Sequence, residues 1–290
     1  MKTCLIFGAT GWLGKSTIAY LNDKDIKLSL FSSTERQLVY RDKKYMIQSI
    51  EDFRNLKNND FDYFLNYAFL TGDKVNHLNS DKYLDLSNTL IEDVSSFLNK
   101  NYIKNSLLTS SGAVYWEGTP KETIYTRQKI KQEECFLKDS EENKVKYSIS
   151  RIFAVFSNYY NVDYEYAFSS FINQGLSGKD IEIKSHNKVL RSYLYFDYLL
   201  DYFFENNNNK IFDAWNVNLD LYDLAKIVSE IFDVGVNVNE EYFKSQHVDE
   251  YISEDKYFIE QTKEIKNIKK LIKEIIDFTE LELNKIREIK

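Results

Sequence analysis

The chain has 290 residues, a formal net charge of -7 and a sequence pI near 5.2. This acidic balance, with no basic patch outside a lysine-rich C-terminus where glutamates interleave, argues against nucleic acid as a partner. Hydrophobic residues make up 43% of the chain, enough for a sizeable core, and two cysteines predict neither a disulfide framework nor a zinc site.

The first residues, MKTCLIFGATGWLG, begin with a lysine and a short apolar run, as a secretory signal does. The run is too short for a signal, and glycines break it where a signal core would continue. No other apolar stretch approaches the length that spans a membrane. We therefore expect a cytoplasmic protein without a membrane partner.

Short apolar runs alternate with helical patterns as far as Phe156. The runs predict strands at 4–10, 26–31, 45–50, 61–68, 105–111 and 147–156. Helical spacing is found at 15–21, at 81–99 and from 126 onward. This alternation favours right-handed crossovers and an α/β fold, in which helices cover both faces of a doubly wound parallel sheet of the Rossmann type.

The rhythm changes after Phe156. The pattern is helical at 164–178, consists of short strands at 180–196, and returns to helix at 198–204. A strand at 212–217, an amphipathic helix at 221–232 and a helical tail from about Ile259 follow. We expect this part to form a smaller, mainly C-terminal domain.

Three glycines, Gly8, Gly11 and Gly14, stand between the first strand and the first helix. Glycine there permits a tight turn, a close approach of the backbone to a pyrophosphate, and close packing of helix on strand. Backbone N–H groups and the helix dipole at this position favour phosphate. We therefore predict a dinucleotide-binding turn. Its contacts are expected from Gly8, Thr10, Gly11, Trp12, Leu13 and Gly14.

A serine turn and a Tyr-x-x-x-Lys pair follow the strand at 105–111. Tyr125/Lys129 is the pair of this kind that follows a strand ending in serines and that also begins the next helix. Its four-residue spacing puts both side chains on one helical face. In an open parallel sheet, that face looks across the carboxyl ends of the strands, where ligands bind. The chain contains four such pairs, at Tyr20/Lys24, Tyr40/Lys44, Tyr125/Lys129 and Tyr222/Lys226.

Ser111, Tyr125 and Lys129 are the residue types that hydride transfer at a carbinol or carbonyl carbon requires. A proton must move at the oxygen, and the unperturbed pKa of tyrosine, about 10, is too high for a good base near neutral pH. A neighbouring ammonium favours the phenolate and lowers that pKa. We predict Tyr125 as the acid/base, Lys129 as its activating cation, and Ser111 as the hydrogen-bond partner of the substrate oxygen.

These motifs resemble the extended short-chain dehydrogenase/reductase family, which contains sugar-nucleotide epimerases, dehydratases and reductases. The glycine spacing is G-x-x-G-x-x-G, LNYAFL stands at the Ala-rich turn over the cofactor, and SSGAVY matches the serine turn. RSYLYFDYLLDYF matches the segment whose arginine meets the nucleotide diphosphate. The resemblance implies a cofactor contact at Ala68, and substrate contacts at Ser111, Tyr125 and Arg191.

The resemblance also implies the domains and the assembly. We expect a dinucleotide-binding domain at 1–160, with a returning segment near 191–218, and an interleaved substrate-binding region at 161–290. Many relatives form dimers through the helices that correspond to 81–99 and 126–139, which implies a homodimer. Its apolar seam would come from Leu84, Leu90, Val94 and Phe97, unless these residues face the sheet instead.

The end of the second strand, LFSSTERQ, bears on the choice of cofactor. NAD-specific relatives commonly place an Asp here, against the ribose hydroxyls. Ser32, Ser33 and Arg36 suit a 2′-phosphate better than two free hydroxyls, and therefore favour NADP. Glu35 takes the acidic role if the strand ends later, so NAD stays possible.

Three reaction types compete within the family. The 4,6-dehydratases carry an Asp-Glu pair beside the catalytic Ser/Thr, where this chain has Gly112 and Ala113. We therefore do not expect a dehydratase. We predict an NADPH-dependent reductase of a nucleotide-linked 4-keto sugar, acting in deoxysugar or surface-polysaccharide precursor synthesis. The alternatives are an NAD-dependent sugar-nucleotide C4 epimerase and a non-catalytic dinucleotide sensor, against which the retained Tyr125 argues. No metal site is expected.

Overall fold

The computed structural model describes residues 1–41, 43–72, 74–158, 166–283 and 287–289. Contacts divide the chain into two compact units. The first comprises Met1–Arg151, Leu200–Phe212 and Lys285–Lys290, and the second comprises Ile152–Leu199 and Asp213–Asn284. Within the described ranges, no helix combines the length and the apolar character needed to span a membrane.

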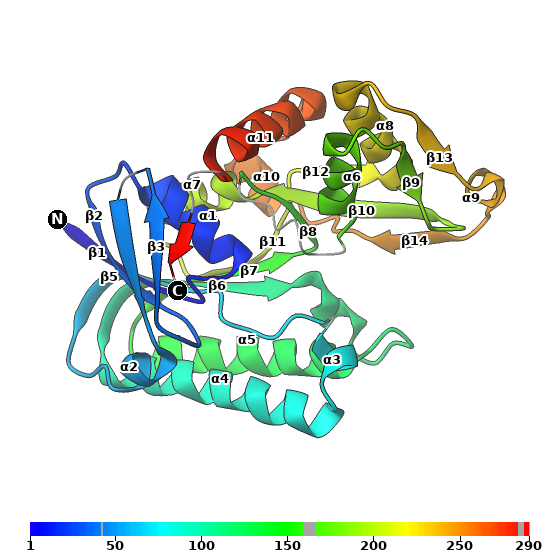
Figure 1. Ribbon diagram of the computed structural model, residues 1–290. Helices are drawn as coiled ribbons and strands as arrows, with labels where there is room; N and C mark the ends of the chain where they lie inside the picture. The colour runs from blue at the N-terminus through cyan, green and yellow to red at the C-terminus, as the bar shows by residue number, and fades with distance from the viewer. Residues whose placement is uncertain (42, 73, 159–165, 284–286, 290) are drawn as a thin grey trace. The chain divides into compact units, whose positions relative to one another are not determined.

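A sheet with the strand order β11-β7-β6-β5-β1-β2-β4-β3-β15 forms the centre of the first unit (Figure 1). β1 pairs in parallel with β2 and β5, β2 with β4, and β5 with β6, so chain order reverses on either side of β1. The strands are β1 (Lys2–Phe7), β2 (Ile26–Phe31), β3 (Arg36–Tyr40), β4 (Lys43–Gln48), β5 (Asp60–Asn66), β6 (Tyr102–Ser111), β7 (Lys146–Ile152), β11 (Lys210–Ala214) and β15 (Arg287–Ile289).

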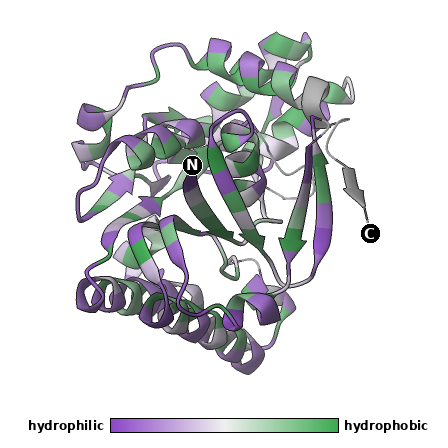
Figure 2. Ribbon diagram, turned by 90° about the vertical axis from the view of Figure 1, so that its left-hand side faces the viewer, coloured by the Kyte–Doolittle hydropathy of each residue, from purple (hydrophilic) through white to green (hydrophobic). Residues whose placement is uncertain are grey.

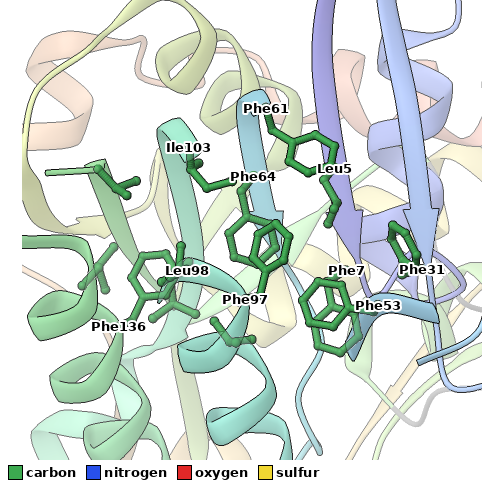
Figure 3. Packing of buried hydrophobic residues seen from close by; sticks show 14 residues of the cluster. Leu5, Phe7, Phe31, Phe53, Phe61, Phe64, Phe97, Leu98, Ile103 and Phe136 are labelled. Carbon is green, nitrogen blue, oxygen red and sulfur yellow. The ribbon is translucent and has the colours of Figure 1, made fainter. Parts of the chain in front are cut away.

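Helices cover both faces of this sheet. On one face, a buried hydrophobic cluster joins the strands to α2, α4 and α5 (Figure 3), and within it the rings of Phe7 and Phe53 stack with centroids 4.1 Å apart. Tyr63, next along the chain to the cluster member Phe64, points to the opposite face and packs there against Phe203 of α7. The helices are α1 (Trp12–Leu21), α2 (Ile50–Arg54), α3 (Lys74–His77), α4 (Ser80–Lys100), the 3-10 turn η1 (Gly112–Trp116), α5 (Ile124–Glu142) and α7 (Phe196–Glu205).

The helices α4 and α5 run side by side beneath the sheet (Figure 1). Val94 and Phe97 of α4 belong to the buried cluster, and Leu90 packs against it. Leu90, Val94 and Phe97 therefore pack within the first unit, which is the alternative to a dimer seam that the sequence left open, because a helix can bury the same apolar spacing against a sheet or against a second copy. Figure 2 shows hydrophobic residues along the central strands and many hydrophilic residues on the helices at the bottom of the view.

The second unit is built around β10, which pairs in parallel with β8 and β14 and antiparallel with β12. β9 and β13 form a separate parallel pair. The expectation of one continuous strand at 147–156 is wrong, because β7 joins the large sheet whereas β8 pairs with β10. The elements are β8 (Ala154–Phe156), α6 (Ala167–Leu176), β9 (Ile181–Ile183), β10 (Lys188–Tyr195), β12 (Val217–Asp220), α8 (Leu221–Phe232), β13 (Val236–Val238), α9 (Glu240–Lys244), β14 (Val248–Tyr251), α10 (Tyr257–Gln261) and α11 (Ile268–Leu283).

Candidate active site

The glycine turn connects β1 to α1 and is closely packed. Gly8 has a φ of +93°, in the left-handed region that favours glycine, and a Cβ there would lie 2.7 Å from the backbone nitrogen of Ala68. A Cβ on Gly14 would lie 2.3 Å from the carbonyl oxygen of Gly8. Both positions therefore require glycine. Of the other predicted contacts, Gly11 is the N-cap of α1, and Trp12 and Leu13 begin the helix.

Gly14→Ala is expected to destabilise the first unit by about 1–3 kcal/mol, as overpacking does, and to weaken dinucleotide binding. The added methyl group meets backbone atoms, which cannot rotate away. Urea unfolding and a cofactor titration measure the two effects. Gly72→Ala is the matched control for stability, because its Cβ would lie 3.6 Å from Tyr125 Cγ, an ordinary contact. Equal unfolding midpoints for the two variants would contradict the tight turn.

The residues predicted to select the cofactor lie in and next to the loop after β2, and they differ in exposure to solvent. The Ser32 hydroxyl is buried and donates to the Thr34 carbonyl oxygen at 2.8 Å. Ser33 and Glu35 are exposed, and so is Arg36, whose Nε donates to Thr34 Oγ1 at 3.2 Å. Ser33, Glu35 and Arg36 thus face solvent near the end of β2, whereas Ser32 stabilises the loop.

Ser111 ends β6 and begins η1. The residue is 7% exposed, and its hydroxyl oxygen accepts a hydrogen bond from the Ala113 backbone N–H at 3.2 Å. The serine thus caps the 3-10 turn that follows the strand. This capping fixes the hydroxyl at the carboxyl end of β6, the sheet edge at which parallel α/β folds bind ligands.

A capping box begins α5. Thr123 Oγ1 accepts from the Thr126 backbone N–H at 3.2 Å, and Thr126 Oγ1 accepts from the Thr123 backbone N–H at 3.3 Å. The helix therefore begins at Ile124, two residues before the position expected from the sequence. Tyr125 lies in its first turn and Lys129 lies one turn later, on the same face.

Lys129 is buried, with a side chain in a largely neutral environment. Its Nζ donates to the Thr109 carbonyl oxygen at 3.2 Å and to Gln132 Oε1 at 2.9 Å, and lies 4.1 Å from the ring centre of Phe69. Burial lowers the pKa of Lys129 to about 7, although the nearby Glu133 carboxylate acts in the opposite direction. The amine of Lys129 therefore titrates near neutral pH.

The side chain of Arg151 on β7 connects α5 and η1 next to the Tyr125/Lys129 helix turn. Arg151 Nη2 donates to Glu133 Oε2 at 2.7 Å and Nε donates to Oε1 at 3.1 Å, a bidentate arrangement. Arg151 Nη1 also donates to the Tyr115 hydroxyl at 3.0 Å. One guanidinium thus joins the helix that carries Tyr125 to the turn that Ser111 begins. In the sequence, the spacing of four residues places Glu133 one helical turn after Lys129. Spacing does not identify Arg151 on β7 as the partner of Glu133.

Arg191, predicted to bind a diphosphate, lies on β10 in the second unit. Its Nη2 donates to Asp249 Oδ2 and its Nη1 to the Asp249 carbonyl oxygen, each at 2.6 Å. The strand pairing of β10 with β14 brings the two residues together. Arg191 therefore has a carboxylate partner of its own. Over the ranges that the structure covers, no three His, Cys, Asp or Glu side chains are grouped to hold a metal ion.

Comparison with known proteins identifies the family. The model of the NAD dependent epimerase/dehydratase family matches residues 4–218. This range contains the glycine turn, Ser111, Tyr125, Lys129 and Arg191. No curated protein sequence matches the chain.

Solved structures of sugar-nucleotide 4-epimerases share the fold. The UDP-N-acetylglucosamine 4-epimerase of Methanobrevibacter ruminantium is similar over 97% of this chain and 98% of its own, with 19% identity and a TM-score of 0.71. The UDP-glucose 4-epimerase of Thermotoga maritima is similar over 97% and 99%, with 15% identity and a TM-score of 0.68. The UDP-N-acetylglucosamine 4-epimerase of Bacillus cereus is similar over 97% of both chains, with 16% identity and a TM-score of 0.68.

The likeness to the solved structures establishes the mixed α/β fold with a large, mostly parallel Rossmann-type sheet. The match to the family model extends over more than half of the sequence and includes both the glycine turn and the Tyr125/Lys129 pair. The chain therefore belongs to the NAD-dependent epimerase/dehydratase family.

Proposed function

We propose that the protein is an NAD-dependent 4-epimerase of a sugar nucleotide. The observation that carries this proposal is the Tyr125/Lys129 pair at the start of α5, tied through Glu133 and Arg151 to the turn that Ser111 begins. The fold likeness to three 4-epimerases supports epimerisation better than the reduction expected from the sequence. We place the activity in the synthesis of surface-polysaccharide precursors.

The glycine turn fits a dinucleotide. A side chain at Gly8 or Gly14 would collide with neighbouring backbone, so glycine there lets the chain turn tightly into the N-terminus of α1. N–H groups and the helix dipole at such a terminus favour a pyrophosphate. Bound nicotinamide supplies the means to remove a hydride from the sugar C4 and to return it. The residues that we propose to hold the cofactor are Gly8, Thr10, Gly11, Trp12, Leu13, Gly14, Ser32, Ser33, Arg36, Ala68, Tyr125 and Lys129.

Three residues serve the proton transfer at the substrate oxygen, Tyr125 and Ser111 directly and Lys129 through Tyr125. Tyr125 takes the proton of the C4 hydroxyl and later returns one to the C4 carbonyl oxygen, so that it acts first as base and then as acid. Protonated Lys129 favours the phenolate form of Tyr125. Ser111 donates a hydrogen bond to the same substrate oxygen.

The experiment that tests the proposal supplies UDP-glucose or UDP-N-acetylglucosamine with NAD⁺ at no more than the enzyme concentration. Proton NMR is expected to show the C4 epimer accumulating over many turnovers, because epimerisation has no net redox change. Turnover that stops when one equivalent of NAD⁺ is consumed would contradict an epimerase.

A reductase is the second candidate, and Arg36 favours it. This exposed arginine begins β3, three residues after the exposed Ser33, and suits the 2′-phosphate of NADP. A reductase would oxidise NADPH stoichiometrically when a 4-keto sugar nucleotide is supplied, which the ultraviolet absorbance of the cofactor reports. The same assay without a keto sugar is the control.

We propose that Arg191 binds the substrate diphosphate in competition with its partner Asp249. Arg191→Ala is expected to raise KM on the order of 10- to 100-fold, because a hydrogen bond to a charged group contributes about 1.5–3 kcal/mol. Asp249→Asn keeps the arginine and removes the competing charge, so KM should stay level or fall. Steady-state kinetics measure both. An unchanged KM in Arg191→Ala would assign the arginine to the scaffold alone.

A homodimer through α4 and α5 remains part of the proposal. Because Val94 and Phe97 pack against the sheet, the contact has to use the other sides of these helices. Leu86 of α4, which is 40% exposed, lies on such a side.

A further inference from the structure

The ring of Phe69 contacts both members of the proposed catalytic pair. Phe69 follows Ala68 in the loop after β5, and its ring centre lies 4.1 Å from Lys129 Nζ. The Tyr125 ring meets it edge-on, with centroids 6.4 Å apart and an interplanar angle of 65°. A single aromatic side chain from another element is thus placed against the acid/base and against its activating cation.

The ring provides what the other partners of Lys129 lack. The two hydrogen-bond acceptors, the Thr109 carbonyl oxygen and Gln132 Oε1, are uncharged. An ammonium carries three donors, and the negative face of an aromatic ring attracts a cation. Because Lys129 is only 5% exposed, water contributes little to the stabilisation of its charge. The Phe69 face therefore serves as the third partner of the ammonium.

The charged surroundings of Lys129 leave its protonation finely balanced. Glu133, on the same helix, favours the charged form, but Arg151 from β7 neutralises the Glu133 carboxylate through a bidentate ion pair. β6 contributes the Thr109 carbonyl, the loop after β5 contributes Phe69, and Tyr125 lies one helical turn away. Burial brings the pKa of Lys129 to about 7, so a modest change in its contacts alters its charge at neutral pH.

We propose that Phe69 is a positioning residue that holds Lys129 beside Tyr125 and keeps it protonated near neutral pH. Its effect on catalysis rests on the proposed function, in which protonated Lys129 activates Tyr125. Its effect on the charge of Lys129 does not depend on any substrate.

The test therefore begins with the titration of Lys129 in the free protein. Lysine labelled with ¹³C at Cε is followed by NMR from acid to alkaline pH, and Lys129→Met identifies the signal. In Phe69→Leu the midpoint is expected to fall by about one pH unit, the size of a desolvated cation–π contact. Phe69→Tyr restores a ring face and should restore the midpoint. Phe136→Leu is the matched control, because it removes a buried ring of α5 whose place is the hydrophobic core, whereas the Lys129 ammonium contacts Phe69, Thr109 and Gln132.

The kinetic arm uses the substrate on which the wild type is active. The protonated fraction of Lys129 at pH 7 should fall from about a half to about a tenth in Phe69→Leu, which lowers kcat about fivefold and shifts its pH profile to acid. KM should stay within about twofold, and Phe69→Tyr should recover kcat.

An unchanged Lys129 midpoint in folded Phe69→Leu would overturn the inference, whatever the enzyme catalyses. Should that variant fail to fold, Phe69→Met keeps an apolar side chain without a ring, and the same midpoint decides. A shifted midpoint without any epimerase or reductase turnover would instead count against the proposed function alone.

Discussion

Tyr125→Phe is expected to reduce turnover by about 10²-fold or more, because the phenol is the group that moves the proton at the substrate oxygen. The dinucleotide should still bind, because the glycine turn between β1 and α1 and the other proposed cofactor contacts are unchanged and the substitution keeps the aromatic ring. Initial rates with the identified sugar nucleotide and a separate cofactor titration measure the two quantities.

Tyr222→Phe is the matched control for this variant. Tyr222 also begins a Tyr-x-x-x-Lys pair, but it lies in α8 of the second unit, where its ring packs edge-on against Phe243. It should keep nearly all activity. Near wild-type turnover in Tyr125→Phe, or equal losses in both variants, would remove Tyr125 from the mechanism.

Lys129→Met is expected to abolish most of the activity and yet to stabilise the fold. The folded state holds this amine at a pKa of about 7, whereas an unfolded lysine has a pKa of about 10.4. The folded protein therefore binds fewer protons than the unfolded chain between these values, and its stability rises with pH across this window. The penalty of the buried amine is complete below pH 7 and disappears above about pH 10.5.

Methionine removes this penalty, so the gain in the free energy of unfolding should be on the order of 2–4 kcal/mol at pH 6 and should vanish toward pH 10. Urea unfolding at pH 6, 8 and 10 measures it. Lys131→Met provides the control on the same helix, because Lys131 is exposed and donates to Asn88 Oδ1 at 2.7 Å. A variant less stable than the wild type at pH 6 would show that Lys129 contributes to stability.

The α/β class could be predicted because each strand or helix pattern depends only on residues that are close together in the sequence, and these patterns alternate along the chain. The strands β1, β2, β5 and β6 and the helices α4 and α5 all lie where the pattern indicates. β3 was missed, since Arg36–Tyr40 is a short strand that is stabilised by antiparallel pairing with β4. The division of 147–156 at Phe153 was missed because an apolar run does not show that its halves join different sheets.

The residues of the site likewise fall into those that could be predicted from local sequence patterns and those that could not. Gly8, Gly14 and the Tyr125/Lys129 spacing are local patterns, and the structure places each at the carboxyl edge of the sheet or at the helix start. Phe69 and the Arg151–Glu133 pair depend on contacts between distant segments, which spacing along the chain does not specify. The Asp249 partner of Arg191 is likewise determined by the pairing of β10 with β14.

We propose above all that Tyr125 serves a reversible oxidation at C4 of a sugar nucleotide. The most direct measurement uses UDP-glucose and UDP-N-acetylglucosamine that carry deuterium at C4, with NMR of the products. We expect a C4 epimer that keeps the deuterium at C4, and loss of this product in Tyr125→Phe. An epimer whose deuterium has exchanged with solvent would contradict it, as would the complete absence of oxidation at C4 by an enzyme that binds NAD⁺.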